Sequence, residues 1–120
     1  MLIPVDIESR FDEVTAYWSP KIIGQVNDQY VKIAKLHGEF VWHAHQDEDE
    51  LFLVIRGRLQ IQLEDGEVLL GPGQFVVVPR SVRHNPVAAE ECWIMLIETK
   101  STRHTGDAVT ARTRSIEEQL

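Results

Sequence analysis

Two histidines and a glutamate lie close together in the sequence and form the strongest candidate for a chemical site. They are His43, His45 and Glu50, in the stretch WHAHQDEDE. Successive side chains of a strand point to opposite faces, so His43 and His45 would share a face if residues 39–45 form a strand. If residues 46–49 then form a short connection, His45 and Glu50 would face each other across an antiparallel pair, with Cβ atoms about 5 Å apart. Imidazole nitrogen and carboxylate oxygen are ligands for Zn, Fe, Mn, Ni or Co, so this stretch is a candidate metal site.

The same stretch also has a simpler interpretation. His-x-His alone is a weak signal, because a histidine on a strand is more often exposed or packed in a core than bound to a metal. Asp47, Glu48 and Asp49 are more typical of a solvated turn than of metal ligands. These residues alone leave both interpretations open.

The composition limits the class of protein. The chain has 120 residues, 43% of them hydrophobic, which fits one domain with one core. Lys and Arg number 12 against 19 Asp and Glu, and no basic block is present, so we expect no nucleic-acid partner. No apolar run approaches the roughly 20 residues that cross a bilayer, and the start MLIPVDIESR lacks a signal-peptide pattern. With a single cysteine, Cys92, the chain is expected to be cytoplasmic, without membrane contact and without an internal disulfide.

Most of the chain has the pattern of short strands that make up an all-β barrel or sandwich. The segments are apolar or β-branched and end at Gly, Pro, Asp or Asn, and they cover residues 30–36, 39–45, 50–55, 58–64, 67–70, 74–79 and 92–98. Before them, Ile7, Phe11 and Val14 have helical spacing and follow Asp6, a suitable N-cap. We therefore expect one short N-terminal helix.

The dipeptide Asp65-Gly66 suits a two-residue type I′ hairpin turn. A turn there predicts that Leu63 pairs with Val68 and Ile61 with Leu70, which places the apolar side chains on one face.

Residues 51–55 and 75–78 are apolar at every position, so both faces of these strands need cover. A second copy of the chain is the simplest cover, and we expect a homodimer. Trp18 and Trp42 would fit such an interface, and they would equally fit packing against the N-terminal segment.

A second stretch, GQFVVVPRSVRHNPVA, carries an apolar strand through a short turn to His84. Together with GEFVWHAHQDEDELFLVIRG it resembles the two motifs of the cupin superfamily. The matching positions are Gly38, His43, His45, Glu50 and Gly57 in the first motif and Gly73, Pro79 and His84 in the second. This sequence departs from the family pattern at three points. Four rather than five residues separate Gly38 from His43, Ser81 stands where the family has glycine, and Ala88 stands where it has asparagine.

The resemblance implies a fold and a site. The fold is a double-stranded β-helix, or jelly-roll, barrel with an N-terminal arm at residues 1–24, a barrel at 25–98 and a C-terminal extension at 99–120 that frays toward its end. The site is one divalent metal ion in the barrel mouth, whose ligands are His43, His45, Glu50 and His84.

The expected cavity beside the metal is apolar and lined by Phe52, Val54, Ile61, Phe75 and Val77. A metal site beside such a cavity is compatible with two functions. One is a metal-dependent enzyme that acts on a small organic molecule, of oxygenase, isomerase or decarboxylase type, for which the sequence identifies no catalytic acid or base. The other is a non-catalytic module that binds a metal or a small ligand. His37 and His104 receive no role.

Overall fold

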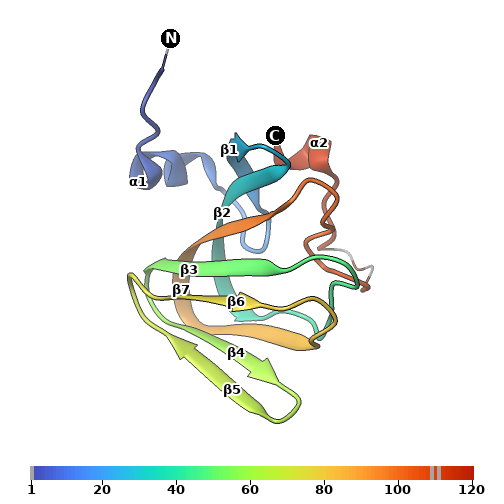
Figure 1. Cartoon of the computed structure of the whole chain (residues 1–120). Coiled ribbons are helices and arrows are strands. Elements are labelled where there is room, and N and C mark those ends of the chain that lie inside the picture. The colour runs from blue at the N-terminus through green and yellow to red at the C-terminus, as the bar shows by residue number, and fades with distance from the viewer. Residues whose placement is uncertain (1, 109, 111) are drawn as a thin grey trace.

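Antiparallel strands form one sheet that curls into a barrel (Figure 1). Apolar side chains fill the interior of this barrel. The computed structural model describes residues 2–108, 110 and 112–120. Its strands are β1 (Lys21–Val26), β2 (Gln29–Glu39), β3 (Glu50–Arg56), β4 (Leu59–Leu63), β5 (Gly66–Leu70), β6 (Phe75–Val78) and β7 (His84–Thr99). The helices are α1 (Ile7–Arg10), the 3-10 turn η1 (Phe11–Glu13) and α2 (Ile116–Gln119). The fold is the all-β jelly roll expected from the sequence, and none of its described helices is long and apolar enough to span a membrane.

The long strand β7 organises the barrel. Its first residues pair with β4, from Leu63 opposite His84 to Gln60 opposite Val87. Its last residues pair with β3, and β2 runs along its other edge. Because β7 pairs with β2, β3 and β4, His84 at its start has a fixed position relative to these three strands.

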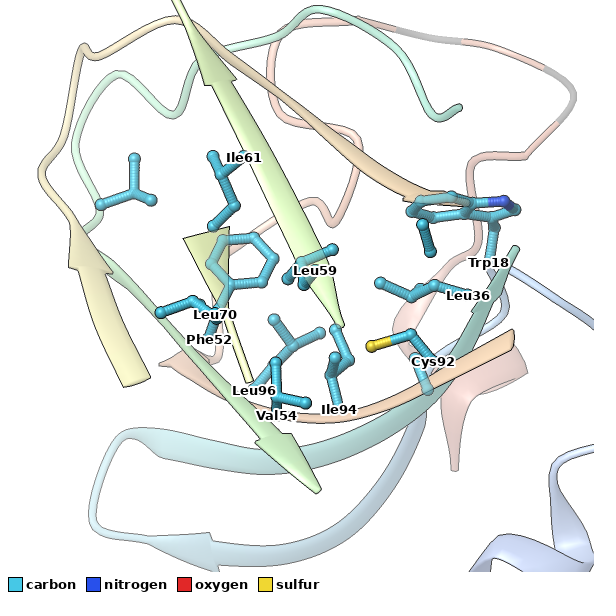
Figure 2. Close-up of a cluster of buried hydrophobic side chains, with 13 residues drawn as sticks. Trp18, Leu36, Phe52, Val54, Leu59, Ile61, Leu70, Cys92, Ile94 and Leu96 are labelled. Carbon is cyan, nitrogen blue, oxygen red and sulfur yellow. The ribbon is translucent and has the colours of Figure 1, made fainter. Parts of the chain in front are cut away.

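The barrel interior is closely packed with aliphatic and aromatic side chains (Figure 2). Phe52 and Val54 from β3 meet Leu59 and Ile61 from β4 there. Cys92 is fully buried, as expected of a packing residue, and burial raises the pKa of its thiol to about 11. The sulfur is therefore neutral and unreactive at physiological pH.

The N-terminal segment covers part of the outer face of the sheet. Phe11 is fully buried and stacks on Trp93 at 4.5 Å between ring centroids. Ile23 and Ile33 lie in the same outer cluster. The predicted helix does begin after Asp6, although it ends at Arg10 and continues only as the turn η1. Ile55 of β3 packs against this cluster, so the chain itself covers one end of the outer face of β3.

Phe75 and Val77 do not line the interior, which corrects the expected cavity. Their exposed fractions are 61% and 44%, and they lie on the outer face of β6. Their strand partners, Leu53 and Leu51, also point outward, whereas Val76 and Val78 face the interior. The four apolar residues FVVV contain no polar position that could indicate which face is buried.

The β4–β5 hairpin has a different register from the predicted one. Ile61 pairs with Val68, not with Leu70, because the turn lies at Glu64 and Asp65. A shift of two residues keeps every side chain on its predicted face, since strand side chains alternate. The observed register also places Gln62 rather than Glu64 opposite Glu67, which avoids a pair of like charges.

Residues 39–45 form no regular strand. Strand β2 extends to Glu39, with an irregularity between Leu36 and Gly38, and an irregular segment follows up to Glu50. Gly38 has a φ angle of 82°, which glycine adopts most readily.

At the other end of the chain, residues 116–119 form α2 instead of fraying. Ser115 and Glu118 form a capping box, in which each side chain accepts a hydrogen bond from the backbone amide of the other residue.

Candidate metal centre

Three imidazoles and one carboxylate converge inside the barrel mouth. The ligand atoms of His43, His45, Glu50 and His84 all lie within 4.8 Å of one another, and all four residues are buried. Glu50 is the first residue of β3 and His84 the first of β7, while His43 and His45 lie in the irregular segment before β3. The structure therefore brings together all four residues singled out in the sequence.

The route by which they meet differs from the expected hairpin. Glu50 pairs with Val78 of β6, not with His45. His43 instead forms an isolated bridge with His84, and their backbones exchange hydrogen bonds of 3.0 and 2.9 Å. This bridge holds the two motifs side by side.

Backbone carbonyls orient two of the imidazoles. Nδ1 of His43 lies 2.9 Å from the carbonyl oxygen of Val41, and Nδ1 of His84 lies 2.9 Å from that of Val82. In each neutral ring the Nδ1–H donates to that carbonyl, so Nε2 carries the lone pair. Burial, together with nearby His84, lowers the pKa of His43 to about 4, so this ring is neutral at neutral pH.

Glu50 completes the site as an ionised carboxylate. Its Oε1 lies 3.2 Å from Nε2 of His45 and 3.5 Å from Nε2 of His84. Burial opposes its ionisation, but the close contacts of the carboxylate with Glu98, His45 and His84 hold the pKa of Glu50 well below its usual value. The same contact with Glu50 outweighs burial at His45 and raises the pKa of that ring.

A buried ion pair lies next to this carboxylate. Nζ of Lys32, on β2, is 2.8 Å from Oε1 of Glu98, on β7. Burial, followed by the charge of Glu50, raises the pKa of Glu98 well above its usual value. The sequence analysis missed Lys32 and Glu98, although the alternation of Lys32 with Ala34 and Leu36 on the inward face of β2 is a signal that could have found the lysine.

Ser81 provides the turn that delivers His84. Its φ angle is 70°, the left-handed conformation that glycine adopts most easily, and the cupin motif has glycine at this position. The Ser81 amide donates to the carbonyl oxygen of His45 at 2.6 Å. Serine therefore forms the turn for which the family motif has glycine.

The Cupin domain family matches residues 29–98, which include all four converging residues. The chain belongs to the cupin family. A cupin-2 domain containing protein from Shewanella frigidimarina is 43% identical, with a TM-score of 0.79 over 80% of this chain and 94% of its own. NMB1881 from Neisseria meningitidis is 27% identical, with a TM-score of 0.74 over 82% of this chain and 100% of its own.

The uncharacterized protein YdbB of Bacillus subtilis is also similar to this cupin. It is 40% identical over 63 residues, which are 52% of this chain and 56% of YdbB. The match thus spans just over half the length of that relative.

The donor set of this cupin fits a divalent transition-metal ion. Nε2 of His43 and Nε2 of His84 are buried and have no hydrogen-bond partner among the described residues. A buried polar atom without a partner is unfavourable, and a cation would satisfy both nitrogens. Oriented imidazoles beside one ionised carboxylate are ligands that Fe, Mn, Zn, Ni and Co accept.

An apolar cavity of about 30 Å³ adjoins the ligands. Its walls include Trp18, Leu36, Phe40, Phe52 and Leu96, together with His43, Glu50 and His104. Of the predicted cavity residues, Phe52 is on this wall, whereas Val54 and Ile61 are buried in the core without lining the cavity. His104 is the polar wall residue that the sequence analysis left without a role.

Proposed function

We propose that this cupin binds one divalent metal ion through His43, His45, Glu50 and His84, and that it acts as a metal-dependent enzyme on a small organic molecule. The observation that carries the proposal is the pair of buried Nε2 atoms, on His43 and His84, that face an ionised Glu50 and have no other partner among the described residues. Oxygenase, isomerase and decarboxylase chemistry all fit such a site.

A bound ion would supply Lewis acidity and would leave coordination positions open for a substrate, because the chain offers four ligands. The residues of the chain have separate tasks. The carbonyls of Val41 and Val82 fix the ring orientation of His43 and His84. The apolar wall, including Phe52, keeps water away from the reacting molecule and orients its carbon part.

The size of the cavity favours a second candidate function. A cavity of about 30 Å³ holds roughly two water molecules, and it is far smaller than a typical substrate-binding cavity. A non-catalytic module that stores or senses a metal or a very small ligand needs no more space. Turnover of an added substrate by the metal-loaded protein would favour the enzyme, and tight metal binding without turnover would favour the module.

Elemental analysis of protein expressed and purified without added metal tests the site itself. Wild type should contain about one transition-metal ion per chain, and His45→Ala and His84→Ala should lose most of it. His37→Ala is the matched control, because His37 is an exposed histidine of the same barrel. Near-full metal content in both ligand variants would contradict the proposal.

We also propose that the protein is a homodimer that associates through the outer face of β3 and β6. Phe75 and Val77 are exposed there, next to half-buried Leu51 and Leu53. Sedimentation analysis should give twice the chain mass of 13.8 kDa for wild type and one chain mass for Phe75→Glu. Leu69→Glu, at another exposed apolar position, is the control and should stay dimeric. A wild-type protein of one chain mass at all concentrations would contradict the proposal.

A further inference from the structure

His104 is a buried histidine that comes from outside the cupin motifs. It lies in the segment after β7, residues 100–108, and only 6% of it is exposed. It lines the same cavity as His43 and Glu50. Its ring lies over Phe40, with centroids 6.0 Å apart and planes 24° apart. The segment thus places a polar ring beside the candidate metal centre.

The segment that carries His104 is tied to the irregular segment that carries His43 and His45. The amide of Asp107 donates to the carbonyl oxygen of Ala44 at 2.9 Å, and the amide of Ala44 donates to Oδ1 of Asp107 at 3.0 Å. Gly106 lies so close that a Cβ atom there would meet the Ala44 oxygen at 2.4 Å and Cδ2 of His43 at 2.7 Å. Because Ala44 lies between two metal ligands, His104 keeps a fixed position relative to the site.

One edge of the His104 ring is satisfied and the other is not. Nδ1 accepts a hydrogen bond from the backbone amide of Arg114 at 3.4 Å. In a neutral ring this leaves the proton on Nε2, which is buried and has no hydrogen-bond partner among the described residues. Burial, opposed by the nearby carbonyl of Arg112, lowers the pKa of His104 to about 4, in keeping with a neutral ring. A buried donor without a partner points to a ligand that supplies the acceptor.

The charges around the cavity favour an anion as that ligand. Lys32 and Glu98 together add no net negative charge, His104 is neutral, and one carboxylate, Glu50, would face a divalent ion. The site would therefore keep a net positive charge once the ion is bound. The small volume of the cavity restricts the ligand to a few heavy atoms inside apolar walls.

We propose that His104 is a ligand-binding residue, whose Nε2–H donates a hydrogen bond to an oxygen of a small carboxylate that occupies the cavity beside the metal. The second carboxylate oxygen faces the ion, and the short carbon part packs against Phe40 and Trp18. This inference rests on the proposed metal-binding function and names the substrate or ligand class of that same site.

Cobalt(II)-loaded protein tests the proposal through its visible absorption, without any need for turnover. Acetate and chloride are titrated into wild type, His104→Leu, His104→Phe and His104→Gln, with His37→Leu as the control. A chloride ion bound to cobalt has no second atom that could accept a hydrogen bond from His104, whereas a bound acetate has its second oxygen. We expect acetate affinity to fall about 5- to 10-fold in the Leu and Phe variants and to recover in the Gln variant, which retains an N–H donor. Chloride affinity and cobalt stoichiometry should stay unchanged in all of them.

The outcomes separate the two proposals. If wild type binds no cobalt, the metal-binding function is wrong, and the role of His104 is wrong with it. If cobalt binds but acetate affinity is the same in wild type, His104→Leu and His104→Phe, the role of His104 alone is wrong. Equal losses of acetate and chloride affinity would also overturn it, because they would indicate a merely structural role.

Discussion

Lys32 and Glu98 form an ion pair inside the barrel, with Nζ and Oε1 2.8 Å apart and both side chains fully buried. Glu98 also contacts Glu50, a candidate metal ligand on the neighbouring strand β3. The lysine therefore provides the positive charge that lets two acidic side chains share the barrel interior.

Lys32→Met should destabilise the protein by about 3–5 kcal/mol, because it leaves the carboxyl group of Glu98 buried without its partner. Urea unfolding of metal-free protein at neutral pH measures the loss. Lys35→Met is the matched control: Lys35 lies on the outer side over the Trp93 ring, at 5.0 Å, and its loss should cost at most about 1 kcal/mol. A further Glu98→Gln change should restore part of the stability of Lys32→Met, since it removes the buried acid that has lost its partner and that lies against Glu50. Equal losses in the two lysine variants would contradict the role of the buried pair.

The stability of metal-free protein should depend on pH through His104. Burial lowers its pKa in the folded state from 6.5 to about 4. As pH falls below 6.5 the unfolded chain therefore takes up a proton that the folded chain does not, and the free energy of unfolding decreases until the pH reaches about 4. At pH 4, protonation of His104 in the unfolded chain has lowered the free energy of unfolding by about 3 kcal/mol.

Urea unfolding of wild type and His104→Leu at pH 7, 6, 5 and 4 isolates this contribution. Wild type should lose more stability than the variant over this interval, because only wild type contains His104. His43, whose pKa is also about 4, remains in both proteins, so its effect cancels in the comparison. Parallel pH profiles for the two proteins would show that His104 is not buried as a neutral ring.

Ser81→Gly should stabilise the protein by about 0.5–1 kcal/mol. The left-handed φ of 70° costs a residue with a Cβ atom roughly 1–2 kcal/mol, and the greater freedom of glycine in the unfolded chain offsets part of the gain. Ser81→Val should destabilise the protein, since a β-branched side chain tolerates this conformation least. Thermal unfolding gives both values, and a lower melting temperature for the glycine variant would contradict the argument.

Asp107→Ala should loosen the segment that carries His104. The change removes the acceptor for the Ala44 amide at 3.0 Å, so amide hydrogens of residues 100–108 should exchange faster while those of β2 and β7 do not change. Asp65→Ala, in the exposed β4–β5 turn, serves as the control for hydrogen-exchange mass spectrometry. Uniform acceleration over the whole barrel would indicate general destabilisation instead.

The sequence was sufficient to predict the candidate ligands and the fold class. His43, His45, Glu50 and His84 stand at the spacings of a family motif, although the hairpin expected to pair His45 with Glu50 does not form. The predicted β4–β5 hairpin failed only in register, because side-chain alternation determines the face of a residue but not its partner.

The remaining errors have physical causes. Phe75 and Val77 were placed inside because a wholly apolar strand carries no sign of its inward face. His104 was missed because it lies in a polar segment without periodicity, and that segment is held in place by hydrogen bonds between Asp107 and Ala44, 63 residues apart in the chain. Only tertiary packing, which no local pattern encodes, brings such residues into the site.

Trp18 gives the protein an internal optical reporter. Its indole ring stacks on Phe40 with centroids 4.5 Å apart, on the wall of the cavity, while Trp42 is partly exposed and Trp93 lies in the outer cluster. The emission of Trp18 should therefore respond to whatever enters the barrel mouth, and Trp18→Phe should abolish that response. Binding of unlabelled compounds can thus be followed by fluorescence, so a collection of small acids can be screened before any reaction is known.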